Sequence, residues 1–332
     1  MIEWCDYTFN PWVGCRKISP GCDHCYAEML AKRFRPWVQW GGDYDDQNQQ
    51  TDRYWEAPIS WNLRQVKLGR PGLVFCGSMC DFFQGDTKCL DRTRRRLLLT
   101  VEDTPHLVWL MLTKRPAQIR RMHWRVPMGP SAGFGNMWFG ISAENQRFAD
   151  QRWDDLSVYD AGRRFTSLEP LLEPVSVHGM MEKAKGTRPD WVIVGAESGP
   201  GRRPCKSEWV ARVIVHCREL GIPVFVKQIH IHGKVSKHPE EWPPWLRVRE
   251  WPAEFLRNPP QSPLRRGDEG RGTPEAGFRG DDQDPPRSPF LKGGRGEGAP
   301  LSPPVKRGEG RGVMERVSRR RERGGRLEWM GS

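Results

Sequence analysis

Residues 107–115 have the sequence Leu-Val-Trp-Leu-Met-Leu-Thr-Lys-Arg, a run of six apolar residues that ends in three polar ones. A segment that is apolar throughout, rather than at alternate positions, is typical of a parallel strand covered on both faces. The sequence therefore predicts a buried strand here, with polar side chains at its carboxyl end. Five more short, mostly apolar runs predict further strands, at residues 73–77, 137–141, 164–168, 191–195 and 224–227.

Helical patterns lie around and between these runs. They predict helices at residues 26–34, 90–100, 117–122 and 207–220. The last of these has clear boundaries, because Ser207 can cap its start and Gly221 its end. An alternation of six or seven β/α units is typical of an α/β fold, here a partial (β/α) TIM-like barrel of six or seven parallel strands. A doubly wound open sheet is the alternative.

A polar side chain follows each predicted strand. In a β/α barrel the active-site groups gather at the carboxyl ends of the strands, so several of these residues are expected to line one cavity. Taken singly, each is an ordinary loop residue or helix cap. The residues and segments concerned are Ser78–Asp81, Thr113–Arg115, Ser142–Asn145, Glu169–Pro170, Glu197–Gly201 and Gln228.

Three cysteines, Cys15, Cys22 and Cys25, lie within eleven residues near the N-terminus. The Pro20-Gly21 dipeptide between them favours a turn that brings their sulfurs together. The helix predicted at residues 26–34 places Cys25 at a helix N-terminus, where the helix dipole favours a thiolate. Three thiolates on one loop can hold a metal ion or an iron–sulfur cluster and leave one coordination position open.

The composition divides the chain into two regions. The net charge is +12, and residues 257–332 carry 17 Lys and Arg against 11 Asp and Glu, which is half of the surplus. The same segment has 15 glycines and 10 prolines, too little apolar surface to offset its chain entropy. We therefore predict a folded domain at residues 1–255 and a disordered Arg/Gly/Pro-rich tail at residues 256–332.

Two explanations of the tail are open. An Arg/Gly-rich tether for nucleic acid is one, and read-through of a repetitive DNA element is the other. The absence of aromatic residues between the basic ones favours read-through.

Secretion and a disulfide framework are not expected, because the nine cysteines are odd in number and no charged-then-apolar leader precedes Cys5. The longest apolar runs are too short to cross a bilayer. We expect a cytoplasmic protein with reduced thiols and no membrane partner.

Several short motifs follow one another along the chain: Ile2-Glu-Trp4, Asn10-Pro11, Ser19-Pro-Gly-Cys22, Cys25-Tyr-Ala-Glu28, Ser78-Met79, Leu112-Thr-Lys-Arg-Pro116, Ser167-Leu-Glu-Pro-Leu-Leu172 and Glu197-Ser-Gly-Pro-Gly201. In this order they resemble a phage-associated family of unknown function that is known for its three-cysteine motif. The resemblance runs from residue 2 to about residue 230 and ends before the tail.

That family is in turn similar to the radical S-adenosylmethionine enzymes. Those enzymes carry three cysteines on the loop after the first strand of a partial β/α barrel, and the cysteines bind three irons of a [4Fe–4S] cluster. The fourth iron chelates S-adenosylmethionine, and reductive cleavage yields a 5′-deoxyadenosyl radical that abstracts hydrogen from the substrate. The resemblance implies an enzyme with a [4Fe–4S] cluster and S-adenosylmethionine as cofactors and an electron donor as partner.

The resemblance also implies roles for single residues. Cys15, Cys22 and Cys25 would hold the cluster, although their C-x6-C-x2-C spacing has a first gap of six residues rather than the usual three. His24 stands where an aromatic residue usually contacts the adenine, and it is expected either to stack or to be a ligand. Cofactor contacts are expected from Ser78, Asp81, Glu144 and Ser198, and catalytic roles from Lys114, Glu169 and Glu197.

A structural zinc site is the alternative for the three cysteines, with His24 or a distant cysteine as fourth ligand. Structural zinc sites commonly use paired C-x2-C or C/H units, and the sequence has no second unit of this kind, which favours the cluster. The corresponding alternative function is a zinc-stabilised, phage-related nucleic-acid-binding or defence accessory protein without catalysis.

Other side chains have two interpretations each. Cys76 and Cys80 share a strand face and would form an auxiliary cluster with Cys89, or they are buried structural cysteines. His230 and His232 are a metal pair or, as we expect, surface histidines. The basic run Arg92, Arg94, Arg95 and Arg96 is a solvated helix face or a phosphate-binding patch.

Lys114 and Arg115 end a strand, where they can hold an anionic substrate. The substrate is not identified by the sequence. The basic surplus and the phage association favour a nucleic acid or a nucleotide.

Overall fold

The computed structural model describes residues 2–41, 49–85, 88–123 and 126–256. Within them one eight-stranded sheet joins each strand to the next along the chain. The first seven strands run parallel, and the eighth pairs antiparallel with the seventh. The strands are β1 (Tyr7–Phe9), β2 (Gly72–Cys76), β3 (Leu107–Thr113), β4 (Met137–Ser142), β5 (Arg163–Leu168), β6 (Trp191–Gly195), β7 (Val224–Ile231) and β8 (Lys234–Ser236).

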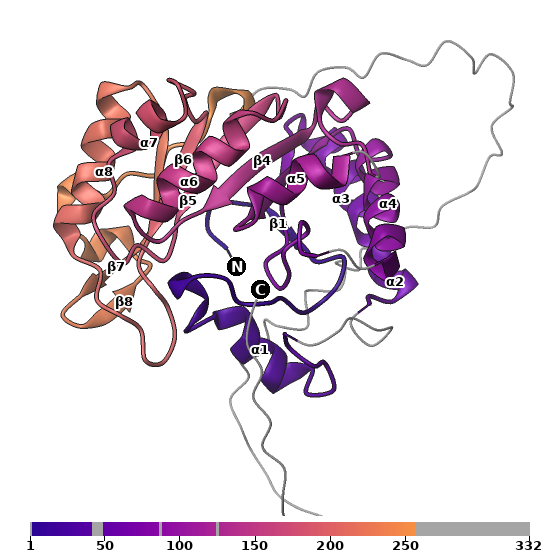
Figure 1. Cartoon of the computed structure of the whole chain (residues 1–332), viewed down its shortest axis with the longest axis horizontal. Coiled ribbons are helices and arrows are strands. Elements are labelled where there is room, and N and C mark those ends of the chain that lie inside the picture. The colour runs from indigo at the N-terminus through magenta and orange to yellow at the C-terminus, as the bar shows by residue number, and fades with distance from the viewer. Residues whose placement is uncertain (1, 42–48, 86–87, 124–125, 257–332) are drawn as a thin grey trace, which may run out of the picture. The chain divides into compact units, whose positions relative to one another are not determined.

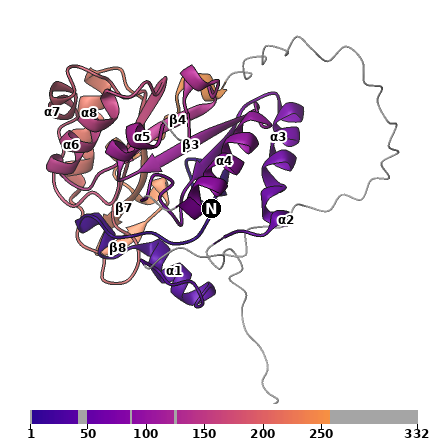
Figure 2. The same ribbon diagram turned by 45° about the vertical axis from the view of Figure 1, so that its right-hand side comes forward.

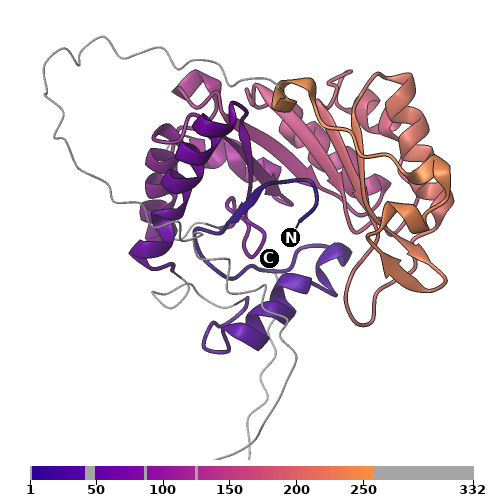
Figure 3. The same cartoon turned by 180° about the vertical axis from the view of Figure 1, so that it is seen from behind.

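The sheet curls into a half-barrel, with helices along its convex side (Figures 1 and 2) and an open concave side (Figure 3). The predicted partial barrel is confirmed, with seven parallel strands. The consecutive strand order excludes a doubly wound sheet, in which the order reverses. The helices are α1 (Tyr26–Phe34), α2 (Asp52–Trp55), α3 (Ala57–Leu68), α4 (Lys88–Glu102), α5 (Pro116–His123), α6 (Gln146–Ser157), α7 (Val177–Lys183) and α8 (Ser207–Glu219).

Strands β2 and β3 are apolar on both faces, because the outer core beneath the helices covers one face and the inner core of the half-barrel covers the other. In β2, Val74 and Cys76 belong to the outer core beneath the helices, whereas Leu73 and Phe75 point to the inner core of the half-barrel. This alternation between two cores explains why the sequence of the strands is apolar almost throughout.

Aromatic rings fill the inner core near the amino ends of the strands. They include Trp4, Trp138, Phe165, Trp191 and Phe225. Gly140 makes this packing possible, because a Cβ atom there would lie 2.4 Å from the Phe165 ring. Beyond these rings the inward-facing residues become polar, so the space at the carboxyl ends of the strands is left for a site.

The predicted helices are present, with small differences at their ends. The helix predicted at residues 26–34 matches α1, and α4, α5 and α8 cover the other three segments. The predicted cap Ser207 is wrong by one residue, because Lys206 is the N-cap of α8 and makes no side-chain cap bond. Gly221 does follow the end of α8 in the left-handed conformation that glycine favours, with φ of 63°.

The basic run on α4 is not a uniformly solvated face. Arg94 is fully buried, and its guanidinium donates to the carbonyls of Phe82 (3.0 Å) and Gln84 (2.5 Å) and to Asp91 (2.8 Å). It also lies over the ring of Trp12, 5.6 Å from the centroid. Arg94 therefore joins α4 to the loop after β2, and for this residue the expectation of a solvated side chain is wrong.

Replacing Arg94 with alanine is expected to lower the free energy of unfolding by about 3 kcal/mol or more, because buried carbonyls and a carboxylate lose their donor. Urea unfolding measures the change. Arg92 is exposed on the same helix, and Arg92→Ala should change the stability by less than about 0.5 kcal/mol. Equal unfolding midpoints for the two variants would contradict this role of Arg94.

The predicted tail falls almost wholly outside the described residues, because residues 257–332 are not among them. Its disorder and the domain boundary at residue 255 stay predictions. Among the described helices, none combines the length and the apolar character that crossing a bilayer requires.

Candidate functional site

A cavity that opens to solvent lies at the carboxyl ends of the strands. Cofactors and small substrates bind at this end of β/α barrels. Ten of the eleven residues predicted for the site line it: Cys15, Cys22, His24, Cys25, Ser78, Asp81, Lys114, Glu169, Glu197 and Ser198. The eleventh, Glu144, is fully buried behind the wall.

The three-cysteine loop connects β1 with α1 and forms one wall of this cavity. Pro20–Cys22 form a single 3-10 turn, closed by a hydrogen bond from the Cys22 N–H to the Ser19 carbonyl (2.8 Å). Cys25 is the N-cap of α1. The turn at Pro20-Gly21 and the position of Cys25 at a helix N-terminus are therefore both confirmed.

All three cysteines of the loop are partly exposed free thiols. They line one cavity, yet they do not form a closed ligand set. Across the described ranges, no group of three or more His, Cys, Asp or Glu side chains is arranged to hold a metal ion. The cluster and the zinc ion both stay predictions.

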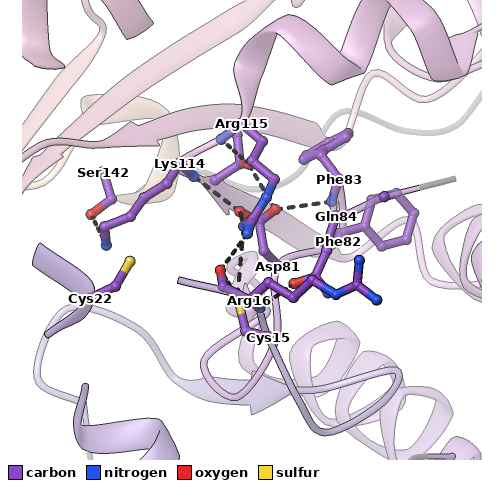
Figure 4. Close-up of polar contacts among 12 residues, drawn as sticks. Cys15, Arg16, Cys22, Asp81, Phe82, Phe83, Gln84, Lys114, Arg115 and Ser142 are labelled. Atoms are coloured by element: carbon purple, nitrogen blue, oxygen red, sulfur yellow. Dashed lines mark hydrogen bonds and ion pairs between the residues drawn. The ribbon is translucent and has the colours of Figure 1, made fainter. Parts of the chain in front are cut away.

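Arg115 attaches the first cysteine to the end of β3 (Figure 4). Its Nη1 donates to Asp81 Oδ2 (2.9 Å) and lies 3.6 Å from the Cys15 sulfur, and its Nη2 donates to the Arg16 carbonyl. Burial and the Asp81 charge raise the pKa of the Cys15 thiol to about 12, although the Arg115 charge opposes them. Arg115 thus supplies the positive charge that a thiolate at this position needs.

Asp81 holds the loops after β2 and β3 together. Its carboxylate accepts hydrogen bonds from the Thr113 hydroxyl (2.7 Å), the backbone N–H groups of Phe83 (3.0 Å) and Lys114 (3.1 Å), and the Arg115 guanidinium. These four donors match the four acceptor positions of a carboxylate. In this arrangement Asp81 positions Arg115, and its predicted contact with the amino group of a cofactor stays a prediction.

Glu144 attaches the middle of the cysteine loop to the end of β4. Its carboxylate accepts from the Gly21 N–H (3.2 Å) and from Arg152 (2.9 Å), whose side chain is almost fully buried. Glycine favours this approach, because a Cβ atom at position 21 would lie 3.1 Å from the Glu144 carboxyl group and would force a shift of a few tenths of an ångström. Burial raises the pKa of Glu144, but the Arg152 charge lowers it, and together with the hydrogen bonds from Ser19 and Gly21 and the Lys114 charge it brings the pKa below its usual value.

Glu197 and Arg203 attach the loop to the end of β6. Arg203 donates to Glu197 Oε1 (2.5 Å) and to the Pro20 carbonyl (2.8 Å), and it lies 3.5 Å from the Asp23 carboxylate. His24 Nδ1 is 3.2 Å from the second Glu197 oxygen. Burial raises the pKa of Glu197, but the hydrogen bonds from Arg203 and His24 lower it overall, so the carboxylate is ionised.

Each carboxylate that lines the cavity has a cation of its own. The three pairs are Asp81 with Arg115 (2.9 Å), Glu169 with Lys227 (2.5 Å) and Glu197 with Arg203 (2.5 Å). Lys114 is different, because its ammonium donates to the neutral Ser142 hydroxyl (2.9 Å) and pairs with no carboxylate in the described part of the chain. Lys114 is therefore the lining cation whose ammonium contacts no carboxylate of the described chain.

The remaining predicted residues point to the same space. The Ser78 hydroxyl is bonded to the Asn10 side chain (2.9 Å), and Ser198 follows Glu197 on the wall. Both hydrogen bonds to the Glu169 carboxylate end on Oε1, one from Lys227 and one from Gln228 (3.3 Å). No described residue donates a hydrogen bond to the second oxygen of Glu169.

Sequence reasoning missed two cations and one aromatic residue of the site. Arg203 follows the glycine-rich segment 197–201, and nothing in its position predicts that it returns to the cysteine loop. Lys227 was assigned to a strand, although a lysine at the end of a buried strand is itself a signal of an inward polar position. Trp4 lines the cavity from outside any predicted element, and its buried Nε1 has no hydrogen-bond partner.

Cys76 and Cys80 are buried, as their structural interpretation expects, and burial raises the pKa of both thiols. Cys80 also lines the cavity, close enough to Cys15 for the two to interact electrostatically. The side chain of Cys89 lies outside the described part of the structure, so the auxiliary cluster stays untested.

His230 and His232 do not act as a pair. The Cys205 N–H donates to His230 Nδ1 (3.1 Å), and His230 Nε2 lies 3.1 Å from the Glu197 carbonyl. Both ring nitrogens of His230 are thus engaged by the backbone, whereas His232 is exposed. The expectation of a surface residue is right for His232 and wrong for His230, which supports the loop that carries Glu197.

The comparisons with known proteins give the family of the chain. No curated protein matches the chain. A family model described as "Protein of unknown function (DUF5131)" matches residues 1–318. The match extends beyond the region of predicted resemblance, which ended near residue 230, and it spans most of the 332 residues. The chain belongs to this family.

Proposed function

We propose that the protein is a radical S-adenosylmethionine-type enzyme whose [4Fe–4S] cluster is held by Cys15, Cys22 and Cys25. One observation carries the proposal: three thiols of one short loop line the same cavity as polar side chains from the ends of β2 to β7. A metal centre at this place would face residues suited to binding a cofactor and a substrate.

The donor set fits such a cluster in its chemistry. Thiolates are the ligands that iron–sulfur clusters prefer, and a set of three leaves one iron without a protein ligand. Arg115 beside Cys15 favours a thiolate, and Glu144 and Arg203 hold the loop at Gly21 and Pro20. The three sulfurs are not arranged to hold a metal ion in this structure. Binding of a cluster would therefore require the cysteine loop to move its sulfurs together while Gly21 and Pro20 stay attached to Glu144 and Arg203.

The bound cluster would supply one electron to the sulfonium of S-adenosylmethionine. The residues of the chain would bind and orient the reacting groups around it. His24 is half-exposed at the cavity wall and can stack on a nucleobase, while Ser78 and Ser198 offer hydroxyl groups. Glu169 has one carboxylate oxygen available to accept a proton or a hydrogen bond at a fixed position beside Lys227.

The Lys114 ammonium contacts no carboxylate of the described chain, and this supports an anionic substrate group beside it. Its ammonium has only the Ser142 hydroxyl as acceptor, so two of its protons can bind a phosphate or a carboxylate. Arg115, the second basic residue at this strand end, is already engaged by Asp81 and the cysteine loop. A nucleotide would supply an anionic group for Lys114 and a flat ring for His24. The protein partner would be an electron donor.

One observation favours the alternative function. Cys80 is a fourth thiol on the cavity wall, beside Cys15, and four cysteines are a common set for structural zinc. On this account the protein is a zinc-stabilised nucleic-acid-binding or phage-defence accessory protein without catalysis. Burial raises the pKa of the Cys80 thiol as it does that of Cys15, so it opposes the bound thiolate in both accounts. The polar side chains that line the same cavity favour the enzyme.

Anaerobic reconstitution with iron and sulfide tests the proposal. We expect a brown protein with thiolate-to-iron absorption, about four irons and four sulfides per chain, and 5′-deoxyadenosine after addition of S-adenosylmethionine and a strong reductant. Metal analysis of the purified protein is the parallel measurement. A colourless protein that retains one zinc per chain and yields no 5′-deoxyadenosine would contradict the proposal and support the zinc alternative.

A further inference from the structure

The helix that follows the cysteine loop combines exposed cations with exposed aromatic rings. α1 packs Ala27 and Ala31 into a small core with Val13, Val38 and Met79, and this leaves its other side in solvent (Figures 1 and 3). Four exposed residues on and just after this helix form what we call the α1 surface: Lys32, Arg33, Phe34 and Trp37. Phe34 is 40% exposed and Trp37 is 59% exposed.

Positive charge exceeds negative charge around this surface. Residues 16–35 contain five Lys and Arg against two Asp and Glu. Glu28 is shared by two ammonium groups, those of Lys17 (2.9 Å) and Lys32 (2.8 Å), so it balances only one of them. The Arg33 guanidinium lies over the Phe34 ring, 5.1 Å from its centroid.

Cations interleaved with exposed aromatic rings suit single-stranded nucleic acid, because the cations bind phosphates and the rings stack on bases. A lipid surface fits less well, since the apolar stripe of α1, Ala27 and Ala31, is buried within the protein. Arginine and aromatic residues are also enriched at protein interfaces, but the surplus of positive charge favours the phosphates of a nucleic acid over a protein partner.

We infer that the α1 surface binds single-stranded nucleic acid at the mouth of the cavity. Tyr26, Ala27 and Trp40, from the same segment of chain, line the cavity itself. A strand that crosses the α1 surface would therefore pass the opening, where one nucleotide could enter and present a phosphate to Lys114. The entry of a nucleotide as substrate rests on the proposed function, whereas binding at the α1 surface does not.

Fluorescence anisotropy with a labelled twelve-nucleotide oligothymidylate and the metal-free, reduced full chain tests the inference. Trp37→Ala should weaken binding about tenfold, as expected for the loss of one stacked base. The double variant Lys32→Gln/Arg33→Gln should reduce the slope of log K against log salt by about 1.4, which corresponds to two phosphate contacts on a single strand. Every variant carries the same residues 257–332, so a difference between variants comes from the substituted side chains.

Matched controls exist elsewhere on the chain. Trp245→Ala removes an indole that is 63% exposed, and Arg120→Gln/Arg121→Gln removes two adjacent exposed cations on α5. Neither should change the affinity or the salt slope. Equal effects of Trp37→Ala and Trp245→Ala, or a protein that binds vesicles containing phosphatidylglycerol but not the oligonucleotide, would overturn the inference. Oligonucleotide binding that depends on Trp37 in a protein that never loads iron would retain the inference and reject the proposed enzyme.

Discussion

A Cys22→Ser variant is expected to lose the proposed metal centre almost completely, with iron per chain falling from about four to below one after identical anaerobic loading. A serine hydroxyl is a harder and far less acidic ligand than a thiol, and two remaining cysteines cannot hold three irons. Cleavage of S-adenosylmethionine should fall to the background of the reductant. Iron and sulfide analysis together with 5′-deoxyadenosine formation measure the loss.

Cys22 is the most informative of the three cysteines, because its structural contacts are few. Its sulfur lies 3.9 Å from the Ser19 hydroxyl, whereas the Cys15 sulfur contacts Arg115. The unfolding midpoint of the metal-free variant should therefore equal that of the parent protein. Cys205→Ser is the matched control, a cysteine away from the cavity that should load iron normally. A Cys22→Ser protein with full iron content would reject the three-cysteine centre.

A Glu144→Ala variant is expected to lose about 3–5 kcal/mol of stability, because the nearly buried Arg152 is left without its carboxylate. The same change removes the acceptor of the Gly21 N–H, so the cysteine loop loses its attachment to the end of β4. Urea unfolding measures the first effect. The second effect should appear as faster loss of iron from the loaded protein.

Two further variants test whether the loss of stability comes from the unpaired Arg152 charge. The double variant Glu144→Leu/Arg152→Met removes both charges and should recover much of the stability, since no unpaired charge stays buried. Asp52→Ala breaks the pair with Arg96, but Asp52 is 90% exposed, and this variant should leave the unfolding midpoint unchanged. A Glu144→Ala protein as stable as the Asp52→Ala protein would contradict the role of Glu144.

The half-barrel was predictable because its local signals agree with its tertiary structure. The run at residues 107–112 is apolar on both sides, and β3 is in fact covered by the outer core on one face and the inner core on the other. Helix boundaries were less exact, as at Ser207, because a cap depends on a single side-chain orientation that neighbouring loops can change. The burial of Arg94 was not predictable, since a run of arginines on a helix does not indicate which of them contacts buried carbonyls.

The candidate site was also predictable in one respect and not in another. Strand ends of a parallel sheet must meet at one edge, so the convergence of Asp81, Lys114, Glu169 and Glu197 follows from the fold class. Their partners do not follow from it. Glu144 was expected at the cofactor and instead holds Gly21 and Arg152 behind the wall.

The sequence by itself determined the residue types and their order: three soft thiols on one loop, apolar strands, and a polar side chain after each strand. These are local properties, set by the periodicity and the chemistry of neighbouring residues. Only the tertiary structure decided which charges pair, because Glu169 and Lys227 are 58 residues apart in the sequence and meet only when their strands join one sheet. That pairing accounts for the cation of each cavity carboxylate and leaves Lys114 as the charge available to a ligand.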